Sequence, residues 1–124
     1  MRGVITLRKA VKDYLREQGI SLEDLLDAMD ESLEGVIESL MKRVSIDYKD
    51  ALELEKNYGT RQLNLLIFAI QVFYLMPFSG YYKGYLIIPT REEVLNKEGK
   101  VSKNGLYKII RSLGLKPRWA SFSL

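Results

Sequence analysis

The chain has 124 residues, of which 47% are hydrophobic, and it carries a formal net charge of +3 with no histidine and no cysteine. This length and composition suit a single domain with an ample apolar core. Without cysteine and histidine, the chain cannot form disulfides, thiolate or imidazole zinc sites, cysteine nucleophiles or Ser-His triads. We therefore expect neither an enzyme nor a bound cofactor or metal.

The first segment predicts a helix that ends at Gly19. Its apolar residues recur at helical spacing and form one stripe: Val4, Leu7, Val11, Tyr14 and Leu15. Charged residues interrupt the N-terminal apolar stretch too early for a secretory signal, so a cytoplasmic location is the default expectation.

A second helical segment begins after Ser21, which can cap it. Leucine, methionine and valine alternate there in steps of four and three: Leu22, Leu26, Met29, Leu33, Val36 and Leu40. The pattern favours one long helix over residues 22–44, although Ser32 and Gly35 offer a break into two shorter helices. Such heptads pack lengthwise on another helix, either within the chain or in a homodimer formed through the N-terminal helices.

Two further helices are expected in the middle of the chain. One runs from about Asp47 to Tyr58 and stops at Gly59. The next, residues 63–78, is apolar on nearly every side but is shorter than the roughly 20 apolar residues that span a bilayer. We expect a central helix enclosed by its neighbours and no membrane segment.

The residues that follow, 81–89, are rich in tyrosine and isoleucine and suggest a short hairpin centred on Lys83 and Gly84. Stacked tyrosines beside a lysine are also compatible with a platform for single-stranded bases. The simpler interpretation is that this hairpin seats the C-terminal segment on the helical body.

Two helices joined by a turn are predicted in the C-terminal segment. Thr90 and Glu93 have the spacing of a capping box, which predicts a helix from Thr90 to near Gly99. Ser102 caps a second helix, and Gly114 ends it. The apolar face of the second helix has helical spacing, with Leu106, Ile109, Ile110 and Leu113.

The opposite face of the second helix carries amine, amide, phenol and guanidinium groups, which bind phosphates and base edges. Its residues are Lys103, Asn104, Tyr107, Lys108 and Arg111.

Residues 101–115 resemble the turn and recognition helix of helix-turn-helix and winged-helix regulators, which often run Val-Ser-x-x-Thr-Val-x-Arg-x-Leu-x-x-Leu-Gly-Leu. The matching residues are Val101, Ser102, Leu106, Ile110, Leu113, Gly114 and Leu115. The resemblance implies that this helix enters the DNA major groove and that Ser102 meets a phosphate as well as capping the helix. Gly105, where threonine is usual, and Lys100, where the turn glycine is usual, depart from the pattern.

Charge is distributed unevenly along the chain. Residues 1–62 carry a net charge of −3 and residues 63–124 a net charge of +6. A basic C-terminal segment attracts the phosphate backbone of DNA, although an anionic membrane or an acidic protein would be attracted too.

The sequence therefore predicts a mainly α-helical bundle with a C-terminal helix-turn-helix and one short β-hairpin. We expect a helical body over residues 1–78 and a hairpin with a DNA-binding module over residues 79–124. The function predicted is that of a small transcriptional regulator that binds double-stranded DNA as a homodimer. The predicted contacts are Lys100, Ser102, Lys103, Lys116 and Arg118 for the backbone, and Asn104, Tyr107, Lys108 and Arg111 for base edges.

Two other classes stay open. A helical adaptor would bind another protein through the heptad face, and its basic segment would only form a solvated surface. A magnesium-dependent nuclease would use the acidic stripe of the second helical segment, which contains Asp24, Asp27, Asp30, Glu31, Glu34 and Glu38.

Overall fold

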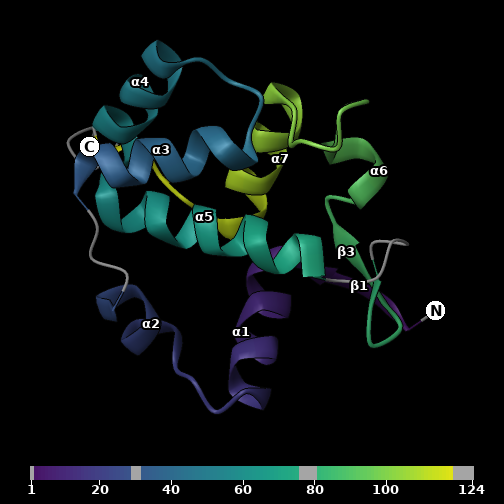
Figure 1. The fold of residues 1–124 in the computed structure, drawn as a ribbon. Helices are drawn as coiled ribbons and strands as arrows, with labels where there is room; N and C mark the ends of the chain where they lie inside the picture. The colour runs from purple at the N-terminus through teal and green to yellow at the C-terminus, as the bar shows by residue number, and fades with distance from the viewer. Residues whose placement is uncertain (1, 29–31, 76–80, 119–124) are drawn as a thin grey trace, which may run out of the picture.

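The computed structural model describes residues 2–28, 32–75 and 81–118. Within them the chain is mainly helical, with a small sheet at one end, as the sequence predicts (Figure 1). The helices are α1 (Leu7–Glu17), α2 (Leu22–Ala28), α3 (Leu33–Arg43), α4 (Tyr48–Tyr58), α5 (Thr60–Leu75), α6 (Arg91–Val94) and α7 (Lys103–Leu113). The strands are β1 (Gly3–Thr6), β2 (Tyr81–Tyr82) and β3 (Tyr85–Ile88).

Helix α5 is the centre of the fold. Side chains on almost every side of it are buried, among them Leu63, Leu66, Ile70 and Phe73. Helices α1, α3, α4 and α7 all contact it, and α3 lies along its length in Figure 1. The predicted enclosed helix is confirmed over residues 63–75, it begins earlier, at Thr60, and the predicted residues 76–78 lie outside the described residues. No helix in the described ranges combines the length and apolarity needed to cross a membrane.

The heptad segment forms two helices, so the prediction of one long helix over residues 22–44 was wrong. The Ser32 hydroxyl accepts a hydrogen bond from the Gly35 amide at 3.3 Å and starts α3 at Leu33. Val36 and Leu40 are buried within the chain, whereas Leu33 is 43% exposed. Val36 and Leu40 therefore pack inside the chain, whereas the side chains of Leu22 and Leu26, and all of Met29, lie outside the described part of the chain.

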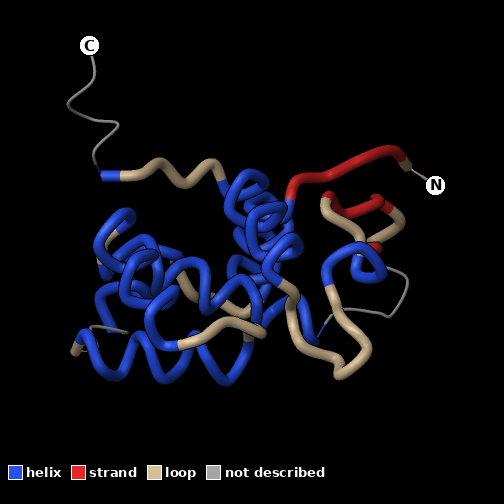
Figure 2. Tube along the Cα trace, turned by 90° about the horizontal axis from the view of Figure 1, so that it is seen from above, coloured by secondary structure: helices blue, strands red, loops and turns tan. Residues whose placement is uncertain are grey.

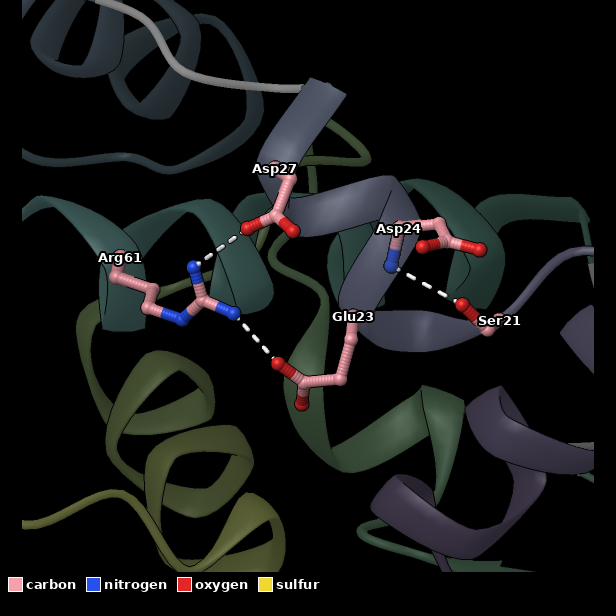
Figure 3. A network of polar contacts seen from close by, with 5 residues as sticks. All are labelled: Ser21, Glu23, Asp24, Asp27 and Arg61. Atoms are coloured by element: carbon pink, nitrogen blue, oxygen red, sulfur yellow. Dashed lines mark hydrogen bonds and ion pairs between the residues drawn. The ribbon is translucent and has the colours of Figure 1, made fainter.

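Helix α2 is tied to α5 by an ion-pair fork. The guanidinium of Arg61 contacts the carboxylates of Glu23 and Asp27, the latter at 2.9 Å (Figure 3). All three side chains are more than half exposed, so water screens the fork and its contribution to the stability of the fold is small.

The N-terminus adds a strand that the sequence analysis did not predict. Val4 belongs to β1 and is exposed, not part of the predicted apolar stripe of a helix. Helix α1 begins at Leu7, because the Thr6 hydroxyl accepts from the Lys9 amide at 3.2 Å.

The sheet has the order β1-β3-β2. The predicted hairpin is confirmed: β2 and β3 are antiparallel and are joined by Lys83 and Gly84, whose φ angles of 51° and 86° suit a two-residue hairpin turn. Strand β1 pairs in parallel with β3, Val4 opposite Leu86. The predicted body and C-terminal segment thus share one sheet and one apolar core.

Candidate nucleic-acid interface

The first helix of the predicted helix-turn-helix is a single turn. Helix α6 spans only Arg91–Val94, so the predicted helix from Thr90 to Gly99 was wrong. The Thr90 side chain makes no capping hydrogen bond. Beyond Val94 the Asn96 carboxamide oxygen accepts from the amides of Glu98 at 2.9 Å and Lys100 at 3.0 Å. An asparagine that binds the backbone locally in this way competes with helix continuation.

The second helix forms where the sequence predicts it. The Ser102 hydroxyl accepts from the Gly105 amide at 3.0 Å, and Gly114 ends α7 in the left-handed conformation with a φ of 69°. The predicted apolar face, including Leu106 and Ile109, is buried. Both ends and the buried face of the helix that resembles a recognition helix are therefore as predicted.

Gly105, a departure from the usual pattern, has a structural cause. A Cβ at this position would lie 2.3 Å from the carbonyl oxygen of Val94, which is closer than real Cβ contacts. The same carbonyl accepts from the Ser102 amide at 2.9 Å and the Ser102 hydroxyl at 3.2 Å. Glycine therefore permits α6 to cross closely over the first turn of α7. The single hydroxyl proton of Ser102 is used inside the protein.

The turn between α6 and α7 is fixed to the rest of the fold. The Arg91 guanidinium lies over the ring of Tyr74, 5.6 Å from its centre. The Tyr74 hydroxyl donates to the Gly99 carbonyl at 2.7 Å, and Val101 pairs with Val44 at the end of α3. These contacts hold the start of α7 in one position, as a binding site of defined geometry requires.

The predicted contact residues of α7 face the solvent. Asn104, Tyr107 and Arg111 occupy the middle of the exposed face, and Tyr107 is 43% exposed. The two lysines lie at its edges. Lys103 is 4.0 Å from the Asp50 carboxylate, and the half-buried Lys108 is 3.6 Å from that of Glu93. Exposed pairs of this kind are weak, so either lysine is able to exchange its carboxylate for a phosphate.

One edge of α7 borders an acidic helix. A cleft of about 120 Å³ separates α4 from α7, and Asp50, Glu53 and Tyr58 line it opposite Lys103 and Tyr107. Burial raises the pKa of Tyr58, and the neighbouring Tyr107 raises that pKa further. The carboxylates of α4 repel phosphates at the Lys103 edge, and Glu93 of α6 repels them at the Lys108 edge.

Three predicted contacts lie outside α7 and are exposed. Lys100 is in the turn, and Lys116 and Arg118 follow Gly114. Arg118 lies against the junction of α4 and α5. A Cβ added at Gly59, between these two helices, would lie 3.2 Å from the Nε atom of Arg118. Arg118 is therefore placed over that junction, apart from the α6–α7 turn where Lys100 stands.

Helix α1 carries a basic row that was not predicted from the sequence. Arg8, Lys12 and Arg16 are spaced by four residues, are all exposed, and line an open groove of about 540 Å³. Arg8 donates to the carbonyl of Leu113 at 3.2 Å. Figure 1 shows the start of α1 meeting the end of α7. The spacing was visible in the sequence, but its position beside α7 depends on the tertiary fold.

Comparisons with protein-family models, curated proteins and solved structures find no significant match to this chain. Among the described residues, no group of three or more acidic side chains is arranged to hold a metal ion. Within the acidic stripe, Asp27 pairs with Arg61, whereas Asp30 and Glu31 lie outside the described residues.

Proposed function

We propose that this protein binds double-stranded DNA and regulates transcription, with the exposed face of α7 in the major groove. The observation that carries this proposal is the projection of Asn104, Tyr107 and Arg111 from a helix whose opposite face is buried. An α-helix fits the major groove, and side chains of these types bind base edges there.

The exposed groups divide into two roles. Arg111 suits the two acceptors of guanine, and Asn104 suits the donor and acceptor of adenine. Lys100, Lys103, Lys116 and Arg118 would contact phosphates, while Lys108 is placed to reach either a base edge or a phosphate. Ser102 would act mainly as the helix cap, since its proton is bound to Val94.

The basic row on α1 would extend the contact along the DNA backbone. Arg8 links this row to the end of α7 through the Leu113 carbonyl, so both surfaces are held in a fixed relation. Each neutralised phosphate releases counterions, which strengthens binding and makes the affinity more sensitive to salt.

A dimer is part of the proposal. One recognition helix makes few base contacts, and two copies related by a two-fold axis would read two half-sites about one DNA turn apart. The helical body is the expected contact between copies. Sedimentation with and without a duplex of two half-sites measures this directly, and a monomer under both conditions would remove the dimer from the proposal.

The experiment that tests DNA binding is a fluorescence anisotropy titration of a random-sequence duplex at about 50 and 200 mM salt. The double variant K108A/R111A should bind at least tenfold more weakly than the wild type and remain folded. The matched control K42A/K56A removes two exposed lysines from α3 and α4 and should bind as the wild type does. Absence of binding by the wild type at low salt would reject the proposal.

An adaptor function is the second candidate, and one observation favours it. Tyr48 and Leu52 lie one turn apart on α4 and are 53% and 37% exposed. Large apolar side chains that neighbour each other on a surface mark contacts with other proteins. Co-purification of a stoichiometric protein that the variant L52E loses, together with no binding to DNA, would support this function instead.

A further inference from the structure

The open groove of about 540 Å³ beside the basic row of α1 has the size of a small-molecule site, and we call it the α1 groove. The row forms one side of it, and the connection from α1 to the start of α2 forms the other. The residues used below are Arg8, Lys12, Arg16, Ile20, Ser21 and Glu23. All six are exposed, so a ligand reaches them directly from the solvent.

The α1 groove is electropositive. Its lining includes three cations, from Arg8, Lys12 and Arg16, and one carboxylate, from Glu23. That carboxylate points toward Arg61, with which it pairs, and Arg61 does not line the groove (Figure 3). The negative charge of Glu23 is therefore balanced from outside, and the remaining field of the groove attracts anions.

The donors of the basic row are available to a ligand. Lys12 has no hydrogen-bond or ion-pair partner among the described residues. Arg16 lies 3.6 Å from the Asp13 carboxylate, which is longer than a hydrogen bond, and its side chain is 78% exposed. Arg8 uses one N–H group on the Leu113 carbonyl. Each guanidinium has further N–H donors, so both arginines are able to bind a phosphate oxygen and keep these contacts.

The spacing of the row selects an anion with more than one charged group. Residues four positions apart on a helix are displaced by about 6 Å along its axis. The first and last phosphates of a triphosphate chain are separated by a similar distance. Lys12 and Arg16 are thus placed to bind the two ends of one triphosphate, whereas a single phosphate engages mainly one of them.

The end of the α1 groove near Arg16 offers a different kind of contact. Ile20 lies there and is 43% exposed, so its side chain provides an apolar surface. The neighbouring Ser21 hydroxyl accepts from the Asp24 amide at 3.1 Å, which leaves its proton for an acceptor on a ligand. A flat ring with polar edges suits this end, and a nucleobase is such a ring.

We propose that the α1 groove binds a nucleoside triphosphate, with the triphosphate along Lys12 and Arg16 and the base against Ile20. The same cations are proposed above to meet the DNA backbone, so the bound nucleotide would compete with DNA. Only this competition rests on the proposed function. The nucleotide is titrated without DNA, so failure of either proposal is seen separately.

The test is isothermal titration of the full chain with ATP, AMP and inorganic tripolyphosphate, in buffer without magnesium at about 50 mM salt. An open site of this kind should bind ATP with a dissociation constant of about 0.1–1 mM. AMP should bind at least about tenfold more weakly, because its single phosphate engages one cation of the row. Tripolyphosphate distinguishes the inorganic chain from the nucleotide, since it lacks the base.

The charge of the groove is tested by K12A, with K9A as its matched control. Lys9 is also an exposed lysine of α1 but does not line the α1 groove. K12A should weaken ATP binding about fivefold, and K9A should change it by less than about twofold, because a distant exposed charge is screened. Equal losses in the two variants, equal affinity for ATP and AMP, or no binding of ATP by the wild type would each overturn the proposal.

The base contact is tested by I20A, which removes part of an exposed side chain. I20A should weaken ATP binding about threefold and leave tripolyphosphate binding unchanged, because only the nucleotide carries a base. If I20A bound ATP as tightly as the wild type does, or lost the same fraction of its affinity for both ligands, a nucleotide would be rejected as the ligand of this groove.

Discussion

Replacing Gly105 by alanine tests the close crossing of α6 and α7. In an ordinary helix this change stabilises by about 1 kcal/mol, since alanine is the better helix former. Here the new Cβ would lie 2.3 Å from the Val94 carbonyl oxygen and 2.7 Å from its Cα. Both neighbours are backbone atoms that cannot rotate away, so α6 and α7 must separate.

The expected cost follows from this separation. Forcing an extra methyl into a packed contact costs about 1–3 kcal/mol. The two hydrogen bonds from Ser102 to the Val94 carbonyl are stretched at the same time, at about 1 kcal/mol each. After the gain in helix propensity, G105A should lower the free energy of unfolding by about 2–4 kcal/mol.

Urea denaturation followed by circular dichroism measures this difference. The control is N104A, one residue earlier on the exposed face, which should change the free energy of unfolding by about 0.5 kcal/mol or less. If G105A were as stable as the wild type or more stable, α6 and α7 would not approach as described, and the reason given for the absence of threonine at this position would be wrong.

Three other changes have defined expected outcomes. The double variant D50N/E53Q removes carboxylates beside α7 and should strengthen DNA binding about threefold to tenfold at low salt, as measured by anisotropy; unchanged binding would show that these groups do not face the DNA. The folded state should lose stability as pH rises above about 10, because burial raises the pKa values of Tyr58, Tyr74 and Tyr82 above the ordinary value of 10.0. The neutral phenols are favoured in the folded state, so their contribution is complete below pH 10 and is lost as pH passes the raised pKa values. Denaturation at pH 9 and pH 11 checks this sign, and equal stability at the two pH values would contradict it. The variant R61A should leave the unfolding free energy nearly unchanged while increasing amide exchange in α2, and unchanged exchange would show that the ion-pair fork does not hold this helix.

Local signals in the sequence were sufficient for α7. Ser102 caps it, Gly114 ends it, and the spacing of its apolar residues fixes which face is buried, all within fifteen residues. The exposed positions of Asn104 and Arg111 follow from that spacing alone. The hairpin at Lys83 and Gly84 was predictable for the same reason, because its turn chemistry is local.

The errors arise where local signals compete or where distant segments meet. The spacing of Thr90 and Glu93 favoured a long helix, but the side chain of Asn96 closes a turn instead. Val4 fits the periodicity of a helix, yet it pairs with Leu86 of β3, a partner far away in the sequence. The position of Arg8 beside Leu113 has the same non-local origin.

Nuclear magnetic resonance measures most directly whether the exposed face of α7 contacts DNA. The amide signals of ¹⁵N-labelled protein are followed while a duplex of about 15 base pairs is added at low salt. We expect the largest shifts at Asn104, Tyr107 and Arg111, smaller shifts along the basic row of α1, and none on α3. Unchanged signals on α7, or shifts confined to other helices, would contradict DNA recognition by this helix.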